Sequence, residues 1–434
     1  MIYHDKVKGA IDMEQKLHTP EGVRDIYNLE CRKKLTVQNQ LHHTLHLYGY
    51  QDIQTPTFEY MDVFREEIGT ISSRELYKFF DREGNILALR PDITPSIARA
   101  TATLFEYEEF PIRLCYIGNT FINHSSYQGR LKENTQLGAE LIGEDSIEAD
   151  AEMIAMLVDG LKQVGLKEFQ VNIGHVDYLR ALLESSGLQE EIKAEIYTLI
   201  ANRNYFGVDE ILDREGTESS IKEAFQTLPE LVGGVEVLRK AAMNTTHQKA
   251  KSAIVRLLKI YALLQLYGVE EHVTFDLSMS GSYGYYSGII FRAYTYGTGD
   301  AVVRGGRYDH LLEKFGKSTP SIGFAIIVDE LMSALSRQKI DVDSGHRNLI
   351  VYNDVSQKNA MALAKECRNR GKCIILLKRD AGKTKANYTE YGKKIHADRL
   401  LYLNDDGKIE MVHLKTGEER ILSSKKRKTE GGIQ

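Results

Sequence analysis

Four short polar stretches place charged or aromatic side chains beside glycine within segments that predict β-sheet. A strand with a purely structural role would alternate such residues with apolar ones, so these stretches are candidates for a binding site. The four stretches are LRPDIT (89–94), GRLKENTQLGAE (129–140), SYGYYSG (282–288) and RGGRYD (304–309).

The second stretch places an amide and a carboxylate four residues apart. Gln136 and Glu140 are separated by an even number, so on an extended strand both point to one face, where they could grip an amine or an imidazole. The competing interpretation is that they face solvent on a half-exposed sheet. Asp92 and Thr94 are likewise two residues apart; the alternative for Thr94 is that it caps the helix that Pro95 starts.

The other two stretches offer rings and guanidinium groups. On a strand, adjacent Tyr285 and Tyr286 point to opposite faces, so one ring would line a pocket and the other would point away. Arg304 and Arg307 flank two glycines, where backbone can approach a ligand closely. A tight turn or a bulge would explain the same glycines.

Familiar catalytic and metal-binding motifs are missing from the sequence. It contains no GxxxxGK[ST], HExxH or GxSxG, and no GxGxxG that follows a strand and opens a helix. The 13 histidines show no metal-ligand spacing, and His42, His43 and His46 are expected on the solvent face of a helix. The four cysteines form no CxxC pair and are expected to be reduced and buried. We therefore expect no metal, no cofactor and no catalytic residue.

Hydrophobic periodicity predicts the elements that must position these residues. Helices are expected over 28–50, from Thr94 and over 146–165, and strands on either side of a turn at Gly84, within 113–143, at 169–174 and over 273–304. The block 176–268 is almost entirely helical in pattern, with interruptions expected at Gly207, Gly216 and Gly233-Gly234.

Length and composition limit the class of protein. The chain has 434 residues, 42% hydrophobic, and a formal net charge of −5, which excludes a global positive field for binding a polyanion. No secretory signal or membrane-length apolar run is present, so a cytoplasmic protein is expected. We predict a core over 1–338 with a helical insertion at about 176–268, an α/β domain over 346–423, and a basic, disordered tail over 424–434. The less favoured interpretation of that tail is an arm that binds phosphate groups.

Taken together and in order, several motifs carry a family resemblance. TPEGVRDI (19–26), LRPDIT, FINHSSYQGRLKENTQLGAELIG (121–143), YYSGIIF (285–291), GGRYDHLLEKFG (305–316) and PSIGFA (320–325) resemble histidyl-tRNA synthetase and its paralogue, the regulatory subunit of ATP phosphoribosyltransferase. The C-terminal domain more weakly resembles an anticodon-binding domain. The implied fold is α+β: a class II aminoacyl-tRNA synthetase-like antiparallel sheet flanked by helices, with a helical insertion and a small α/β C-terminal domain.

The resemblance also implies which part of a synthetase pocket is kept. Three arginines of the synthetase pattern are replaced, by Ile122, Gly281 and Glu330, which removes cations that would stabilise phosphate charge. The residues implied to bind histidine are Asp92 (in place of a glutamate), Thr94, Gln136, Glu140 and Tyr286, with Tyr285 and Arg130 as nearby candidates.

A pocket with histidine contacts but without phosphate contacts implies a non-catalytic sensor. The implied partner is the short-form catalytic subunit of ATP phosphoribosyltransferase, which carries out the first step of L-histidine biosynthesis, in a hetero-octamer of four regulatory and four catalytic chains. Histidine is the implied effector, through this subunit, the partner or their interface. An active histidyl-tRNA synthetase is the alternative. An RNA-binding sensor of uncharged tRNA is a third reading, opposed by the net charge.

Overall fold

The computed structural model describes residues 17–65, 71–108, 111–124, 130–280 and 284–422. The predicted basic tail lies outside these residues. The described chain forms two compact units, one extending to Val342 and the other from Asp343, which also takes in Ile26–Lys33. Each unit is described by itself. The predicted domain boundaries stay a prediction.

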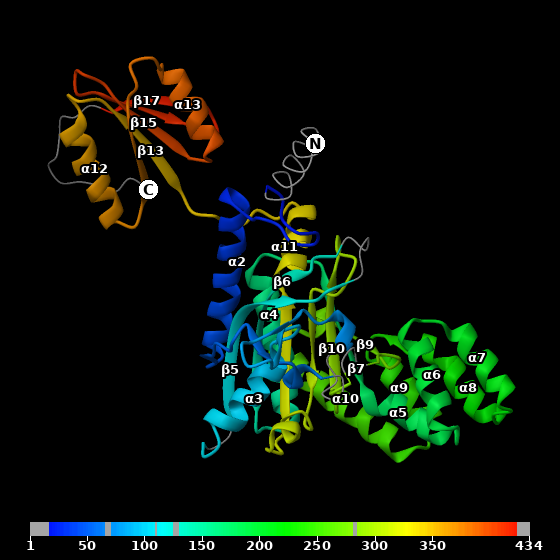
Figure 1. The fold of residues 1–434 in the computed structure, drawn as a ribbon. Helices are drawn as coiled ribbons and strands as arrows, with labels where there is room; N and C mark the ends of the chain where they lie inside the picture. The colour runs from blue at the N-terminus through cyan, green and yellow to red at the C-terminus, as the bar shows by residue number, and fades with distance from the viewer. Residues whose placement is uncertain (1–16, 66–70, 109–110, 125–129, 281–283, 423–434) are drawn as a thin grey trace, which may run out of the picture. The chain divides into compact units, whose positions relative to one another are not determined.

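A large, mainly antiparallel sheet forms the centre of the first unit (Figure 1). Among the described residues its strand order is β1-β5-β6-β12-β11-β10-β7-β9-β8, and only the β1/β5 and β7/β9 pairs are parallel. The strands are β1 (Gln51–Asp52), β5 (Ile112–Phe121), β6 (Glu133–Ile142), β7 (Phe169–His175), β8 (Val232–Gly233), β9 (Val273–Asp276), β10 (Ile289–Thr295), β11 (Val303–Arg307) and β12 (Ser321–Ile327).

Side-chain alternation gives the middle of this sheet two different faces. On β6, Leu137, Ala139 and Leu141 belong to the main hydrophobic core, whereas Gln136 and Glu140 point to the other face. The core face is covered by the buried sides of three helices, which are α2 (Asn28–Leu47), α4 (Ile147–Gln163) and α10 (Gln248–Tyr267). Helix α4 begins where Ser146 caps it, because the Ser146 hydroxyl accepts a hydrogen bond from the Ala149 N–H at 3.1 Å.

The opposite face carries α3 and a second, smaller apolar cluster. Helix α3 (Thr94–Leu104) has Pro95 in its first turn, as predicted, and its Ile97 packs with Leu114 and Tyr116 of β5. Nearby, a three-stranded sheet is made of β2 (Phe58–Tyr60), β3 (Lys78–Phe80) and β4 (Ile86–Leu89), with 3-10 turns at Met61–Phe64 and Ser73–Glu75. The predicted turn at Gly84 joins β3 to β4, and Gly84 has the positive φ of 87° that such a turn requires.

The expected helical insertion follows β7 and packs through α10 against α4 (Figure 1). One predicted break is wrong: Gly207 lies inside α7, whose first turn is capped by Asn204 through a 3.0 Å bond to the Gly207 N–H, so the local cap outweighs the glycine. Gly216, with φ of 64°, does end a helix. The helices are α5 (Val176–Ser185), α6 (Glu190–Ala201), α7 (Tyr205–Arg214), α8 (Ser219–Thr227) and α9 (Glu236–Asn244), with 3-10 turns at Leu228–Glu230 and Glu270–His272.

The 3-10 turn Leu312–Phe315 precedes β12. Helix α11 (Val328–Arg337) follows β12 directly, as the strand-to-helix pattern predicted. In the part of the chain that the structure describes, no helix has both the length and the apolar composition needed to cross a bilayer.

The second unit contains a five-stranded sheet in the order β14-β13-β15-β16-β17. Its strands and helices are β13 (Arg347–Tyr352), α12 (Gln357–Asn369), β14 (Cys373–Lys378), α13 (Lys385–Lys394), β15 (Arg399–Leu403), β16 (Ile409–His413) and β17 (Glu419–Leu422). The β/α alternation was predicted, and the terminal antiparallel pair β16/β17 was not. The expectation that the cysteines are buried is confirmed only for Cys115: Cys31 and Cys367 are half-buried, and Cys373 is exposed at the start of β14.

Candidate ligand-binding site

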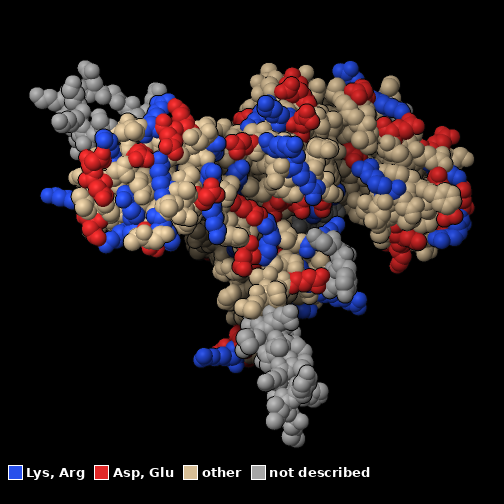
Figure 2. Space-filling model, turned by 90° about the horizontal axis from the view of Figure 1, so that it is seen from above, with Lys and Arg blue, Asp and Glu red and all other residues tan. Residues whose placement is uncertain are grey.

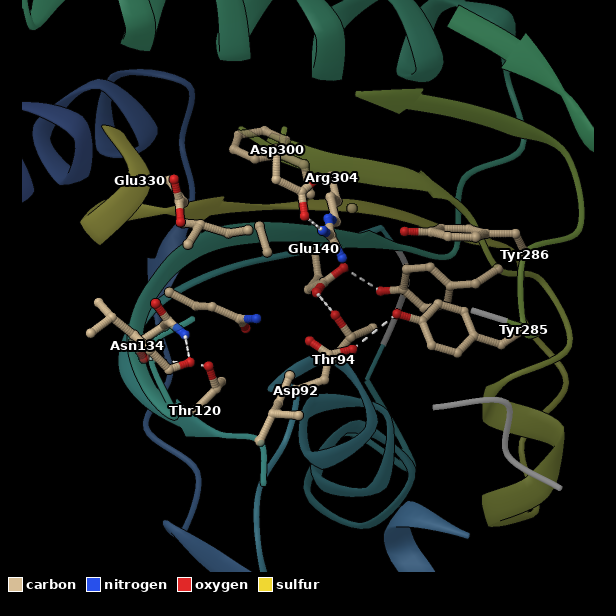
Figure 3. A pocket seen from close by; sticks show the side chains of 18 of the residues that line it. Asp92, Thr94, Thr120, Asn134, Glu140, Tyr285, Tyr286, Asp300, Arg304 and Glu330 are labelled. Atoms are coloured by element: carbon tan, nitrogen blue, oxygen red, sulfur yellow. Dashed lines mark hydrogen bonds and ion pairs between the residues drawn. The ribbon is translucent and has the colours of Figure 1, made fainter. Parts of the chain in front are cut away.

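A cavity of about 160 Å³ opens on the α3 face of the large sheet, between β6, β12 and the segment before β10. A cavity of about 150 Å³ holds a benzene ring, so this one suits a single small ligand. Figure 3 shows Glu140 near its centre, with Asp92 and Thr94 on one side and Asp300 and Arg304 on the other. All seven residues predicted for the site line it: Asp92, Thr94, Arg130, Gln136, Glu140, Tyr285 and Tyr286.

Glu140 is fully buried and hydrogen-bonded through both carboxyl oxygens. Its Oε1 accepts from the Thr94 hydroxyl at 2.7 Å, and its Oε2 accepts from the Tyr308 hydroxyl at 2.5 Å. The facing residue on β12 is Gly323, the register partner of Glu140. A methyl group at Gly323 would overlap the Glu140 carboxyl, so glycine is what allows this carboxyl to lie between the two strands.

Burial sets the protonation of this carboxyl. Desolvation raises the pKa of Glu140 to about 8, although the hydrogen bonds from Tyr308 and Thr94 act in the opposite direction. Burial likewise raises the pKa of Asp92. At neutral pH the Glu140 carboxyl is therefore largely neutral until a cationic group approaches it.

Thr94 does not cap α3, so the alternative interpretation of Thr94 as a helix cap is wrong. The helix has Ile93 at its cap position with no side-chain cap bond, and the Thr94 hydroxyl turns to Glu140. Asp92 lies just before the helix, accepting from the Ile93 N–H at 2.9 Å and from the Tyr285 hydroxyl at 3.0 Å. The two residues thus connect the start of α3 to the sheet and to the tyrosine pair.

The prediction that Tyr285 and Tyr286 point to opposite faces is wrong. Both line the cavity, with ring centroids 5.0 Å apart and ring planes 56° apart. The reason is that both precede β10, which starts at Ile289, so strand alternation does not apply to them. Together they form an aromatic wall opposite Asn134 and Thr120 (Figure 3).

Gln136 offers the pocket a buried hydrogen-bond acceptor. Its side chain is buried, and its Oε1 has no hydrogen-bond partner among the described residues. An unpaired buried acceptor costs about 1–3 kcal/mol, so it marks a place where a donor is expected. An N–H group of a bound molecule would satisfy it.

The two arginines of RGGRYD separate. Arg304 lines the cavity and pairs with Asp300 at 2.6 Å, whereas Arg307 is buried on the other side of β11, where it pairs with Asp150 at 2.5 Å. Residues three apart on a strand face opposite sides, which explains the separation. Arg130 also borders the cavity but is solvent-exposed.

Two of the three positions implied to lack phosphate-binding arginines line the same cavity. Ile122 and Glu330 both line it, and Gly281 lies outside the described residues. Burial, with the nearby Asp300 and Asp329 charges, raises the pKa of Glu330. Among the described lining residues there are four carboxyl groups and only two arginines, so the cavity offers few cations to a polyphosphate.

Sequence reasoning missed Tyr308 and Asp300. Tyr308 lies within RGGRYD, one of the four polar stretches, and its place in that stretch was a usable signal. Asp300 lies in the loop before β11, and nothing in its spacing relates it to Arg304 before the fold is known.

Comparisons with known proteins show which family the chain resembles over most of its length. A family model described as Histidyl-tRNA synthetase matches residues 22–331. The regulatory subunit of ATP phosphoribosyltransferase from Acetivibrio thermocellus is 37% identical, with 93% of this chain and 97% of the relative covered. The protein of the same name from Ruminiclostridium cellulolyticum is 36% identical, with 92% and 95% covered.

Solved structures show the same fold. A crystal structure described as an ATP phosphoribosyltransferase regulatory subunit/histidyl-tRNA synthetase from Bacillus halodurans aligns with a TM-score of 0.79 and 32% identity, covering 89% of this chain and 97% of that one. Histidyl-tRNA synthetase from a Nostoc species aligns with a TM-score of 0.79 at 20% identity, covering 94% and 97%, which supports the fold alone. The predicted class II synthetase-like fold is confirmed.

Proposed function

The chain belongs to the family of ATP phosphoribosyltransferase regulatory subunits, and from this premise we propose that its pocket binds histidine to control a separate catalytic subunit. The family places the chain in histidine biosynthesis. The partner is the short-form catalytic subunit, in a hetero-octamer of four regulatory and four catalytic chains. A cytoplasmic location accords with the free state of all four cysteines.

One observation supports histidine more than any other: a buried carboxyl and an unpaired buried amide oxygen lie on the same face of β6. Glu140 can ionise to pair with an ammonium or imidazolium group, and Gln136 Oε1 offers an acceptor to an N–H group. The tyrosine pair supplies aromatic faces suited to a flat, cationic ring.

A regulatory role without catalysis is supported by the pocket's charge. Forming an aminoacyl-adenylate needs fixed cations where negative charge develops on phosphate, and losing one such donor costs about 10²- to 10³-fold in rate. Ile122 and Glu330 stand in the cavity at two positions where the resemblance expects arginine. Glu330 adds repulsion toward a triphosphate.

The test is feedback inhibition of the purified complex of this chain with the short catalytic subunit. We expect histidine to inhibit phosphoribosyl transfer, and Gln136→Ala to raise the inhibitory histidine concentration by roughly 2- to 10-fold, the effect of losing one hydrogen bond. The matched control is Gln163→Ala, at an exposed position of α4, which should inhibit like wild type. Unchanged inhibition in Gln136→Ala and in Glu140→Gln would defeat the sensor role.

Active histidyl-tRNA synthetase is the second candidate, favoured by the fold match and by the C-terminal unit. ATP–pyrophosphate exchange by the chain alone, dependent on histidine, would establish it. Binding of tRNA has less support: Figure 2 shows Lys and Arg interspersed with Asp and Glu over the described residues of the face in view.

A further inference from the structure

His42, His46, Asp52 and Cys115 meet at the edge of the large sheet, away from the pocket. One possible ligand atom from each residue lies within 4.8 Å of all the others. The prediction that the three helix histidines face solvent is wrong for His42, which is half-buried and hydrogen-bonded to Asp52. His43 is exposed as expected.

Three elements bring these side chains together. His42 and His46 are four residues apart on α2, so they lie on one side of the helix, with ring centroids 4.2 Å apart. Asp52 and Cys115 are direct register partners in the parallel pair of β1 and β5, so they share a face of the sheet. That face is the one on which α2 packs, since Cys115 shares a core with Val37, Leu41 and Leu45 of that helix.

All the contacts converge on the Asp52 carboxylate. His46 Nε2 lies 3.2 Å from Oδ2, Cys115 Sγ lies 3.5 Å from Oδ1, and His42 Nε2 is in close contact with the same Oδ1. With metal–ligand distances of about 2.0–2.3 Å, the donors of a tetrahedral site lie roughly 3.3–3.8 Å apart, so the farthest pair has to approach by about 1 Å.

The donor set selects the kind of metal. Two imidazole nitrogens, one carboxylate oxygen and one thiolate sulfur are ligands that Zn²⁺ accepts, whereas Mg²⁺ and Ca²⁺ prefer oxygen alone. The Asp52 and His46 side chains are 57% and 40% exposed, so an ion can enter from solvent, while Cys115 closes the site from inside.

We propose that His42, His46, Asp52 and Cys115 bind a divalent transition metal of the zinc type. Four protein ligands fill a tetrahedron, so the ion has a structural role and not a catalytic one. It fastens α2 to β1, a strand of only two residues at the sheet edge, which otherwise has few backbone bonds to hold it.

The experiment uses the untagged, full-length chain, stripped of metal by chelation and titrated with Co²⁺ alone in buffer free of histidine. We expect one equivalent to bind, with the visible absorption of a tetrahedral ion and a thiolate-to-cobalt charge-transfer band, and Zn²⁺ to displace it. Because metal binds the folded state, the melting temperature should rise with Zn²⁺ concentration.

Variants identify the ligands. Cys115→Ala should lose the charge-transfer band, and His46→Gln should weaken Co²⁺ binding beyond the roughly 10- to 100-fold that losing a partner of a metal ligand costs. Cys373→Ser and His43→Gln are the matched controls and should bind like wild type. His46 is exposed, so His46→Gln keeps the fold and remains informative where Cys115→Ala fails to fold.

Two results would overturn the proposal: a wild-type chain that shows no charge-transfer band, or wild-type affinity in His46→Gln. The four residues would then be a hydrogen-bond network centred on Asp52. Neither result bears on histidine binding in the pocket, because the two sites share no residue.

Discussion

Glu140 connects the most features of the pocket. It is fully buried, faces Gly323 across the strand pair, and accepts hydrogen bonds from α3 and from the segment after β11. A carboxyl in this setting holds its proton at neutral pH because the ionised form is poorly solvated. The carboxyl can give up this proton and become negatively charged when a ligand brings a cation.

We expect histidine binding to release a proton from Glu140. The pKa of Glu140 is raised to about 8, and pairing with a cationic ligand would favour the ionised form, so below pH 8 the bound state loses a proton. Affinity should then rise with pH, by at most about tenfold per unit, and level off above pH 8. Calorimetry at pH 7 in two buffers of different ionisation enthalpy measures the proton count.

The reference for this measurement is Glu140→Gln, which cannot ionise, so the protonation of histidine itself cancels in the difference. Glu148→Gln, the same change at an exposed position of α4, should behave like wild type. A proton count that is identical in wild type and Glu140→Gln would contradict the assignment.

At the scale of elements, a buried ion pair joins β11 to α4. Arg307 is 2% exposed and meets Asp150, which is fully buried and also receives Arg256 of α10 at 2.7 Å. The pair lies on the core side of the sheet, directly behind the pocket strands. It therefore fixes β11, which carries Arg304 into the cavity.

Arg307→Ala should lower the free energy of unfolding by about 3–5 kcal/mol, because it leaves the Asp150 charge buried with one partner fewer. Chemical denaturation of the full-length chain measures the loss. Arg239→Ala, at an exposed position of α9, should change stability by less than about 0.5 kcal/mol. A loss in Arg307→Ala as small as in this control would show that the pair contributes little.

At the scale of the whole molecule, the two compact units have separate cores. The first unit has its main cluster around α4 and the large sheet, and the second has its own clusters on both sides of β13. Units with separate cores unfold separately unless a large apolar interface couples them.

Scanning calorimetry of the full-length chain should therefore show two transitions. Leu349→Ala, which opens a cavity in the core of the second unit, should lower one transition and leave the other in place. Arg307→Ala should lower the other one. A single transition that both variants shift equally would show that the two units unfold together.

Residue patterns were sufficient for much of this protein. Helical and strand periods predicted the order of elements, and the spacing of Gln136 and Glu140 placed both on one strand face because side chains alternate every two residues. All seven residues that the family resemblance indicated line the cavity. The resemblance also indicated that Ile122 and Glu330 stand where the synthetase pattern has arginine, because the order of the motifs along the chain identifies these positions.

Tertiary structure decided what depends on contacts between distant segments. Thr94 bonds to Glu140 instead of capping its helix, Tyr308 completes that carboxyl's partners, and Asp300 pairs with Arg304, none of which follows from local spacing. The pKa of Glu140 is raised only because strands and helices from across the chain exclude water from it. The grouping of His42 and His46 with Asp52 and Cys115 has the same origin, since helix packing against a sheet edge joins residues that the sequence keeps apart.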